Sequence, residues 1–149
     1  MGEFSYQPDW LNEVPSPAYV VEEKRLVRNL EILKELQERT GCYVLLAQKA
    51  FSMYSCYPLI SKYLKGAAAS GLFEARLAYE EFSGENHVFN PAFQEKEFSE
   101  LLRYCDHFVF NSLVIGIHFG SAVEPEVVAY ISGLPGKRMS LSPFLCLST

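Results

Sequence analysis

The 149-residue sequence contains no run of apolar residues as long as a membrane span and no excess of basic residues. A helix that crosses a membrane needs roughly 20 consecutive apolar residues. The opening segment, MGEFSYQPDWLNEVPSP, lacks the basic stretch and the apolar stretch of a secretion signal. With a formal net charge of −5 at pH 7, the chain has no general attraction for nucleic-acid phosphates. We therefore expect a cytoplasmic protein that binds neither a membrane nor nucleic acid.

The sequence also lacks the short cysteine and histidine spacings that are typical of metal sites. Its cysteines form no C-x-x-C pair, and its three histidines form no H-x-x-x-H pair. Zinc sites are recognised in sequences by such spacings, so we expect no metal site. Cytoplasmic proteins seldom contain disulfides, and we interpret all four cysteines as buried thiols: Cys42, Cys56, Cys105 and Cys146.

Helical and strand patterns alternate along most of the chain. Leucines spaced by three and four predict a helix that ends at Gly41 and buries Leu26, Leu30, Leu33 and Leu36. Residues 42–47 are apolar on both faces, which is typical of a strand in a parallel sheet. The same reasoning predicts helices over residues 55–65, 70–83 and 94–105 and strands over residues 67–69, 87–90 and 107–111.

Three details of this prediction concern helix ends and faces. Ser55 is expected to cap the second helix, and Gly66 is expected to end it. Tyr79 is expected on the buried side of the third helix, together with Leu72, Ala75 and Phe82. Strands that alternate with helices over short connections indicate βα units and a parallel sheet.

Two α/β architectures fit this alternation, an open doubly wound sheet and part of a (β/α)8 barrel. Residues 48–55, after the first strand, contain no glycine, which disfavours the dinucleotide-binding version of the open sheet. A whole barrel needs about 250 residues, and the alternation stops near Leu113. We therefore expect the N-terminal part of a barrel, apparently truncated. Residues 1–14 would be an extension, residues 15–113 a partial barrel domain and residues 114–149 an atypical tail.

Lys49 stands out because it follows an apolar strand. Strand alternation predicts that Lys49 shares a face with Leu45 and Ala47. In a barrel, functional residues gather at the carboxyl ends of strands. An amine desolvated there can act as a Schiff-base nucleophile. On position alone, a lysine whose ammonium reaches water is the favoured interpretation.

Five blocks in order carry a family resemblance between Pro15 and Leu113: PSPAYVVEEKRLVRNL, the A-x-K-A block at Lys49, GAAASGLFEARLAYEEF, HVFNPAF and DHFVFNS. Together they resemble the alanine-racemase-like (fold type III) pyridoxal-phosphate decarboxylases. Among these, they most resemble the carboxynorspermidine (carboxyspermidine) decarboxylase family, which serves polyamine biosynthesis. Ornithine-type relatives carry an aspartate at the position of Ala67, and its absence favours the carboxypolyamine branch.

The resemblance implies a pyridoxal 5′-phosphate enzyme in which Lys49 holds the cofactor. Ala47 would leave room for the cofactor ring, and Ser70 and Glu74 would lie on the cofactor side. An alternative interpretation makes Ser70 a helix N-cap and Glu74 a first-turn residue favoured by the helix dipole. The implied substrate is a small carboxypolyamine, and the full-length family is expected to form homodimers.

Two further functions remain open from the sequence. The chain would be a non-catalytic truncated fragment or pseudoenzyme if the residues missing from the barrel are required for activity. The second alternative is another fold type III enzyme, such as a diaminopimelate- or ornithine-type decarboxylase or a racemase.

Overall fold

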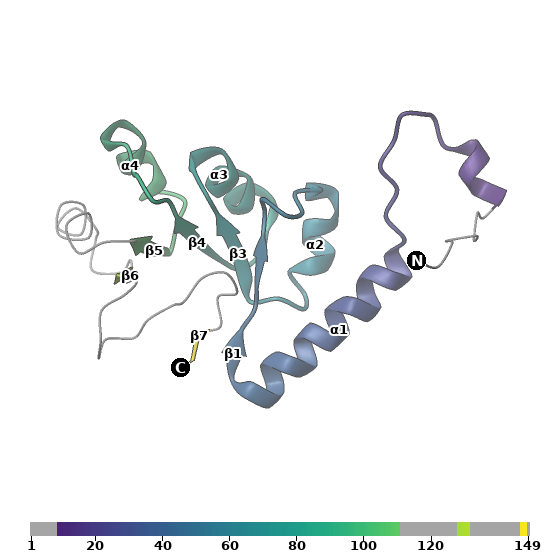
Figure 1. The fold of residues 1–149 in the computed structure, drawn as a ribbon, viewed down its shortest axis with the longest axis horizontal. Coiled ribbons are helices and arrows are strands. Elements are labelled where there is room, and N and C mark those ends of the chain that lie inside the picture. Colours follow the sequence, from purple (N-terminus) through teal and green to yellow (C-terminus); the bar gives the residue numbers. More distant parts are fainter. Residues whose placement is uncertain (1–8, 111–127, 132–146, 149) are drawn as a thin grey trace.

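The computed structural model describes residues 9–110, 128–131 and 147–148, and the structural statements below refer to these residues (Figure 1). The helices are η1 (Asp9–Glu13, a 3-10 turn), α1 (Glu23–Thr40), η2 (Tyr54–Cys56, a 3-10 turn), α2 (Tyr57–Ile60), α3 (Leu72–Glu81) and α4 (Glu95–Leu101). The strands are β1 (Cys42–Tyr43), β2 (Leu45–Ala47), β3 (Gly66–Ala69), β4 (Glu85–Phe89), β5 (His107–Phe110), β6 (Val128–Ile131) and β7 (Leu147–Ser148). No helix in the described part of the chain is long and apolar enough to cross a membrane.

Strands β2 to β6 form one parallel sheet in which spatial order equals sequence order. One row across this sheet joins Ala47, Ala68, His87 and His107, which lie opposite one another on successive strands. A doubly wound sheet instead reverses its strand order at a switch point. Sequential parallel strands are the arrangement of successive βα units in a barrel wall. The short strands β1 and β7 form a separate antiparallel pair.

The helices cover one face of the sheet (Figure 1), and the apolar core lies between these helices and the sheet. Under α3 and α4, the sheet contributes Val88, Phe108 and Phe110, and all three have an exposed fraction of 0%. Phe98 of α4 packs against Phe108 with ring centroids 5.1 Å apart. Burial of apolar area is the main favourable contribution to folding, so this layer holds α4 against β4 and β5.

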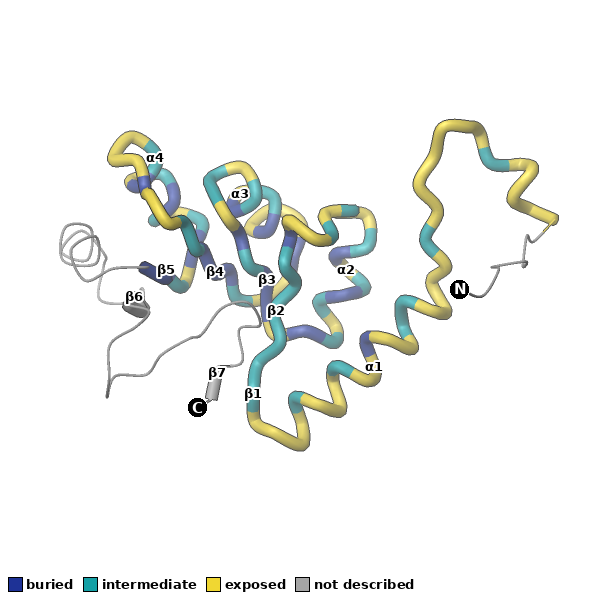
Figure 2. The backbone as a smooth tube through the Cα atoms, in the orientation of Figure 1, coloured by how far each residue is buried: buried dark blue, intermediate teal, exposed yellow. Residues whose placement is uncertain are grey.

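A second apolar cluster attaches α1 and α2 to the start of the sheet. Leu30 of α1 packs there with Tyr57, Ile60 and Ala67. The rest of α1 is largely exposed (Figure 2). The predicted stripe of leucines is therefore only partly buried, since Leu30 is 3% exposed and Leu36 is 47% exposed.

The predicted strand over residues 42–47 is interrupted at Val44. The backbone N–H of Val44 donates a hydrogen bond to Oε1 of Gln37 at 2.8 Å, and Nε2 of Gln37 donates to the carbonyl of Tyr63 at 2.8 Å. The N–H of Val44 therefore bonds to the side chain of Gln37 instead of to a neighbouring strand, and Val44 separates β1 from β2. Cys42 is disulfide-bonded, which corrects the interpretation of all four cysteines as buried thiols, whereas Cys105 is a buried free thiol as expected.

The second and third predicted helices also differ from the structure. The helix expected over residues 55–65 is a single α-helical turn, α2, that follows a 3-10 turn. Gly66 does not end that helix but begins β3. In α3 the buried residues are Ala75 and Ala78, whereas Tyr79 is 62% exposed and was wrongly expected inside.

Gly66 is required by the close approach of two strands. A Cβ at this position would overlap the backbone carbonyl of Glu85 on β4. Because both groups belong to paired backbones in the sheet, neither can move without disturbing the ladder. Glycine is therefore the residue that lets β3 and β4 pair at this point.

We expect Gly66→Ala to lower the free energy of unfolding by about 3 kcal/mol, the upper end of the usual cost of overpacking. The measurement is urea-induced unfolding followed by circular dichroism. Gly71→Ala is the control for a collision, because a Cβ at Gly71 meets nothing within 4 Å. Its effect should stay within about 1 kcal/mol, the typical cost of alanine at a helix N-cap. Equal effects of the two substitutions would contradict this explanation.

Candidate active site

Lys49 lies in a turn directly beyond the carboxyl end of β2. The turn is closed by hydrogen bonds from the backbone N–H groups of Ala50 and Phe51 to the carbonyl of Ala47, at 2.9 and 3.2 Å. Because β2 ends at Ala47, the prediction that Lys49 shares a strand face with Ala47 is wrong. Its side chain is exposed instead, so its amine is accessible to a small molecule.

The residue before the lysine, Gln48, anchors this turn. Its backbone N–H donates to the carbonyl of Ala68 at 3.2 Å, which ties the turn to β3. Its side chain is 1% exposed, and its Oε1 accepts a hydrogen bond from the hydroxyl of Tyr57 at 3.2 Å. Burial and, secondarily, the negative charge of Glu74 raise the pKa of Tyr57 to about 12, so its hydroxyl remains a donor at neutral pH.

Ser70 and Glu74 form a hydrogen-bonded pair at the end of β3. The carboxylate oxygen Oε2 of Glu74 accepts hydrogen bonds from both the backbone N–H and the hydroxyl of Ser70, each at 2.7 Å. The N-cap of α3 is Gly71 rather than Ser70, so the alternative interpretation of Ser70 as a cap is wrong. Glu74 does lie in the first turn of α3, where the helix dipole favours a carboxylate.

The sheet register brings Lys49 and Ser70 to the same end of the sheet, where the carboxyl ends of β2 and β3 lie. Ala47 lies opposite Ala68 on neighbouring parallel strands, and Lys49 and Ser70 each follow these alanines by two residues. All four predicted site residues therefore lie at the carboxyl ends of β2 and β3 or in the first turn of α3. At this end of the sheet, an exposed amine can react with a carbonyl compound, and a hydroxyl that is held by a carboxylate can donate to or accept from its polar groups.

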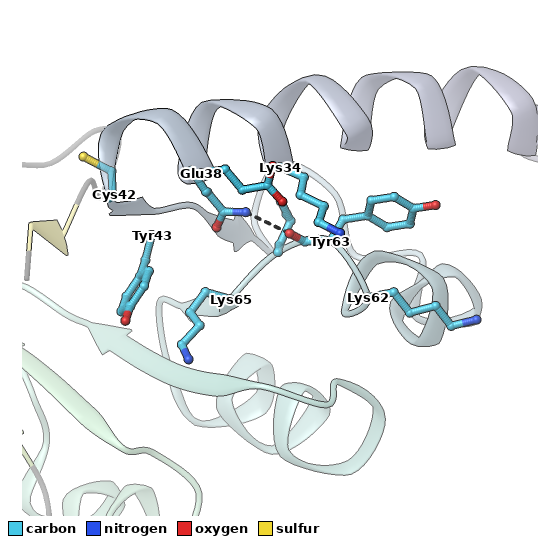
Figure 3. Close-up of a pocket in the computed structure, with 10 residues that line it drawn as sticks. Lys34, Glu38, Cys42, Tyr43, Lys62, Tyr63 and Lys65 are labelled. Atoms are coloured by element: carbon cyan, nitrogen blue, oxygen red, sulfur yellow. Dashed lines mark hydrogen bonds between the residues drawn. The ribbon is translucent and has the colours of Figure 1, made fainter.

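The hollow shown in Figure 3 lies at the opposite end of the strands, where β2 and β3 begin. It has a volume of about 320 Å³ and is bordered by the last turns of α1, by β1 and by the segment that precedes β3. Three lysines line it, Lys34, Lys62 and Lys65. Lys49 is not among its lining residues, so this hollow is separate from the predicted site.

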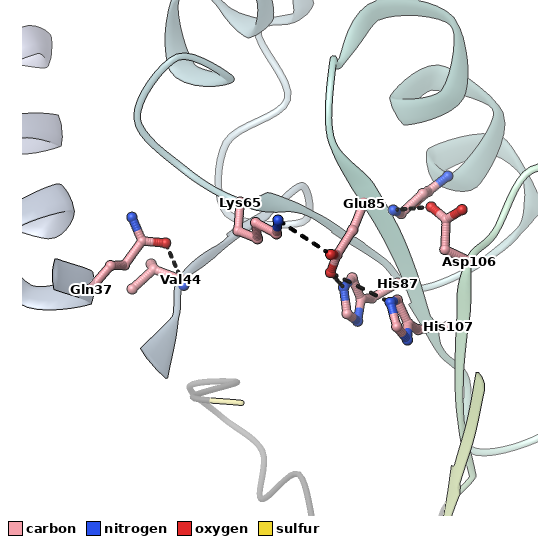
Figure 4. A network of polar contacts seen from close by, with 8 residues as sticks. Gln37, Val44, Lys65, Glu85, His87, Asp106 and His107 are labelled. Carbon is pink, nitrogen blue, oxygen red and sulfur yellow. Dashed lines mark hydrogen bonds and ion pairs between the residues drawn. The ribbon is translucent and has the colours of Figure 1, made fainter. Parts of the chain in front are cut away.

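A polar cluster joins β4 to β5 on the sheet face away from the helices (Figure 4). Oε2 of Glu85 lies 3.2 Å from Nε2 of His87 and 3.4 Å from Nε2 of His107. The other carboxylate oxygen of Glu85 lies 3.6 Å from Nζ of Lys65. Burial, followed by repulsion from His107, lowers the pKa of His87 to about 4 against the opposing effect of Glu85, so this imidazole is neutral at pH 7.

Sequence spacing did not reveal this cluster, because it depends on two strands that are 20 residues apart along the chain. A signal was nevertheless present. Two of the predicted strands begin with a histidine, His87 and His107, and successive βα units place such strands side by side. Gln48 was also missed, because a glutamine beside a lysine has no distinctive pattern.

No family model matches the chain, but curated proteins and a solved structure do. Carboxynorspermidine/carboxyspermidine decarboxylase of Herminiimonas arsenicoxydans is 36% identical over 67% of this chain and 27% of its own length. The Campylobacter jejuni protein of the same name is 42% identical over 68% of this chain and 26% of its own length. Carboxyaminopropylagmatine decarboxylase of Synechocystis is 42% identical over 69% of this chain and 27% of its own length.

The crystal structure of carboxynorspermidine decarboxylase from Campylobacter jejuni, in complex with norspermidine, has a TM-score of 0.71 to this chain. It is 40% identical in sequence, and the match covers 74% of this chain and 30% of that one. This chain is a homologue of the carboxy(nor)spermidine decarboxylases. The chain spans between a quarter and a third of the length of these relatives.

These similarities and the parallel sheet confirm the predicted fold class, an α/β chain corresponding to part of such a decarboxylase. The predicted tail, residues 114–149, lies mostly outside the described residues. Within the described part, the boundary expected at residue 15 falls in the segment between η1 and α1. The cofactor role of Lys49, Ala47, Ser70 and Glu74 remains a prediction.

The raised pKa of Tyr57 predicts a specific dependence of stability on alkaline pH. An unfolded tyrosine loses its proton near pH 10, whereas folded Tyr57 keeps it up to about pH 12. Its contribution to stability is therefore fully present below about pH 10 and is lost as the pH rises towards 12. The loss can reach about 1.4 kcal/mol per pH unit.

We expect Tyr57→Phe to lose stability less steeply than the wild-type chain above about pH 10, because phenylalanine cannot ionise. The measurement is the free energy of unfolding in urea at a series of pH values. Tyr54→Phe is the matched control, since Tyr54 is 57% exposed and should follow the wild-type curve. Parallel curves for Tyr57→Phe and the wild type would refute the prediction.

Proposed function

We propose that this chain is part of a pyridoxal-phosphate-dependent decarboxylase that acts on carboxynorspermidine or carboxyspermidine. The observation that carries the proposal is the exposed lysine in the turn after β2. It lies at the carboxyl edge of a parallel sheet, where barrel enzymes place their reactive groups. The names of relatives that are 36–42% identical support a decarboxylase of carboxylated amines.

The described residues fit the attachment of the cofactor. Lys49 would hold it through its amine, and the small side chains of Ala47 and Ala68 would leave space for its ring. Ser70 offers a hydroxyl oriented by Glu74. Gln48 and Tyr57 hold the turn in place. When bound, pyridoxal phosphate supplies an electron sink for the electron pair left on the α-carbon when the carboxylate departs.

The substrate is proposed as a class, an amine that carries a carboxyl group. Two relatives are named for carboxynorspermidine or carboxyspermidine and one for carboxyaminopropylagmatine. The alanine at position 67 does not narrow the class of possible substrates. It is 0% exposed and packs with Ala78 and Phe82 in the helix-facing core, so the absence of an aspartate there reflects packing rather than a substrate contact.

The partial coverage of the relatives favours a second candidate function. Because the chain matches only 26–30% of their length, the remaining groups of a decarboxylase site have no counterpart in the match. The second candidate is a chain that binds the cofactor through Lys49 and does not decarboxylate a substrate without further polypeptide.

The test of Lys49 is chemical trapping. We expect incubation with pyridoxal phosphate, followed by borohydride reduction and peptide mass spectrometry, to place the adduct on Lys49 in excess of other exposed lysines. Lys49→Arg should abolish this adduct while keeping the positive charge. Lys62→Arg, which alters another exposed lysine, should keep it. Labelling of Lys62 and Lys65 as strong as that of Lys49 would overturn the cofactor proposal.

Release of carbon dioxide from carboxynorspermidine then separates the two candidates. The decarboxylase proposal expects release that depends on added pyridoxal phosphate and is absent in Lys49→Arg. An adduct on Lys49 without release would support the second candidate.

A further inference from the structure

The cluster of Glu85, His87 and His107 has no part in the proposed reaction. Its residues lie at the start or in the middle of β4 and at the start of β5, whereas Lys49 lies beyond the carboxyl end of β2. Three potential donor atoms, one from each residue, lie within 4.8 Å of one another. We propose that they form a site for a divalent transition-metal ion, with Zn²⁺ as the expected ion, which joins β4 to β5.

The spacing of the donors fits a tetrahedral ion. Zinc binds imidazole nitrogen and carboxylate oxygen at about 2.0–2.2 Å, which separates neighbouring ligand atoms by about 3.3 Å in a tetrahedron. The carboxylate oxygen of Glu85 lies 3.2 Å from Nε2 of His87 and 3.4 Å from Nε2 of His107. All three donor atoms lie within 4.8 Å of one another, so one ion fits between them once the imidazole rings have turned towards it.

The chemistry of the donors selects the ion. Two imidazoles and one carboxylate suit zinc and the neighbouring first-row ions, whereas calcium and magnesium prefer oxygen ligands alone. Three protein ligands leave a fourth position of the tetrahedron for water. The site is also built on two hydrogen-bonded strands, because His87 and His107 are register partners, and strands hold ligands more rigidly than loops do.

Metal binding requires the two imidazole rings to turn. They are stacked with centroids 4.0 Å apart and planes 13° apart, and the lone pairs of parallel rings do not meet at one ion. Rotation about the terminal torsion of histidine has broad minima. The side chain of His107 is 15% exposed, whereas that of His87 is 1% exposed, so His107 has the greater freedom to turn.

Lys65 opposes the ion and therefore offers a diagnostic variant. Its ammonium lies 3.6 Å from the second carboxylate oxygen of Glu85, where it neutralises part of the charge that attracts a cation. Removing this ammonium should strengthen metal binding, since the repulsion between two nearby cations is lost. A cluster that serves only as a hydrogen-bond network would show no such effect.

The experiment is equilibrium dialysis of the whole chain against Zn²⁺ after treatment with a chelator, with bound metal measured by mass spectrometry. We expect one equivalent of zinc for the wild-type chain. His107→Ala and Glu85→Gln should each weaken binding by more than about 100-fold, because even the hydrogen-bond partners of metal ligands contribute about 10–100-fold. Lys65→Gln should strengthen binding about fivefold.

Two controls separate this site from other zinc-binding groups. Cys56→Ser removes a free, half-buried thiol, and Glu80→Gln removes a glutamate that pairs with Arg76 on the surface of α3. Both should bind zinc as the wild type does. Circular dichroism verifies that each variant is folded. His107 and Glu85 are both partly exposed, and they are substituted separately so that a folding defect in one variant leaves the other as a test. The proposal is overturned if the wild type retains no zinc, or if His107→Ala and Glu85→Gln bind it as tightly as the controls.

Discussion

The parallel register of β2 to β5 is the constraint on which the rest of the structure depends. It aligns Ala47, Ala68, His87 and His107 in one row. Because Ala47 and Ala68 are register partners, Lys49 and Ser70 follow neighbouring strands, in the turn after β2 and directly after β3. Further along this row, β4 and β5 bring two histidines to the carboxylate of Glu85. Glycine at position 66 permits the register, because any side chain there would collide with the backbone of β4.

The two faces of the sheet have different roles. One face binds the helices through an apolar layer that includes Val88, Phe108 and Phe110, and this layer also fixes the start of α3, which carries Glu74. The other face carries the ionisable cluster of β4 and β5. Because successive residues of a strand point to opposite faces, a single strand such as β4 contributes Val88 to the core and His87 to the polar face.

Much of the fold could be predicted from the sequence, because burial imposes a period on apolar residues. The helix that ends at Gly41, the alternation of strands and helices and the parallel sheet follow from such periods. The errors occurred where a single polar contact or a neighbouring element overrides the local pattern. The side chain of Gln37 interrupts a continuous apolar strand at Val44. Tyr79 of α3 lies against the ring of Tyr104, with centroids 5.3 Å apart, and remains 62% exposed.

The sequence by itself determined the fold class, the homology to carboxy(nor)spermidine decarboxylases and the position of Lys49 at a strand end, since these depend on local order along the chain. Only the tertiary structure decided that Lys49 lies in an exposed turn, that Glu74 holds Ser70 and that Tyr57 supports Gln48. It alone also brought Glu85 to His87 and His107. The reason is physical: a hydrogen bond or a metal site depends on distances of a few ångströms between atoms, and strand pairing sets those distances between residues that are far apart in the chain.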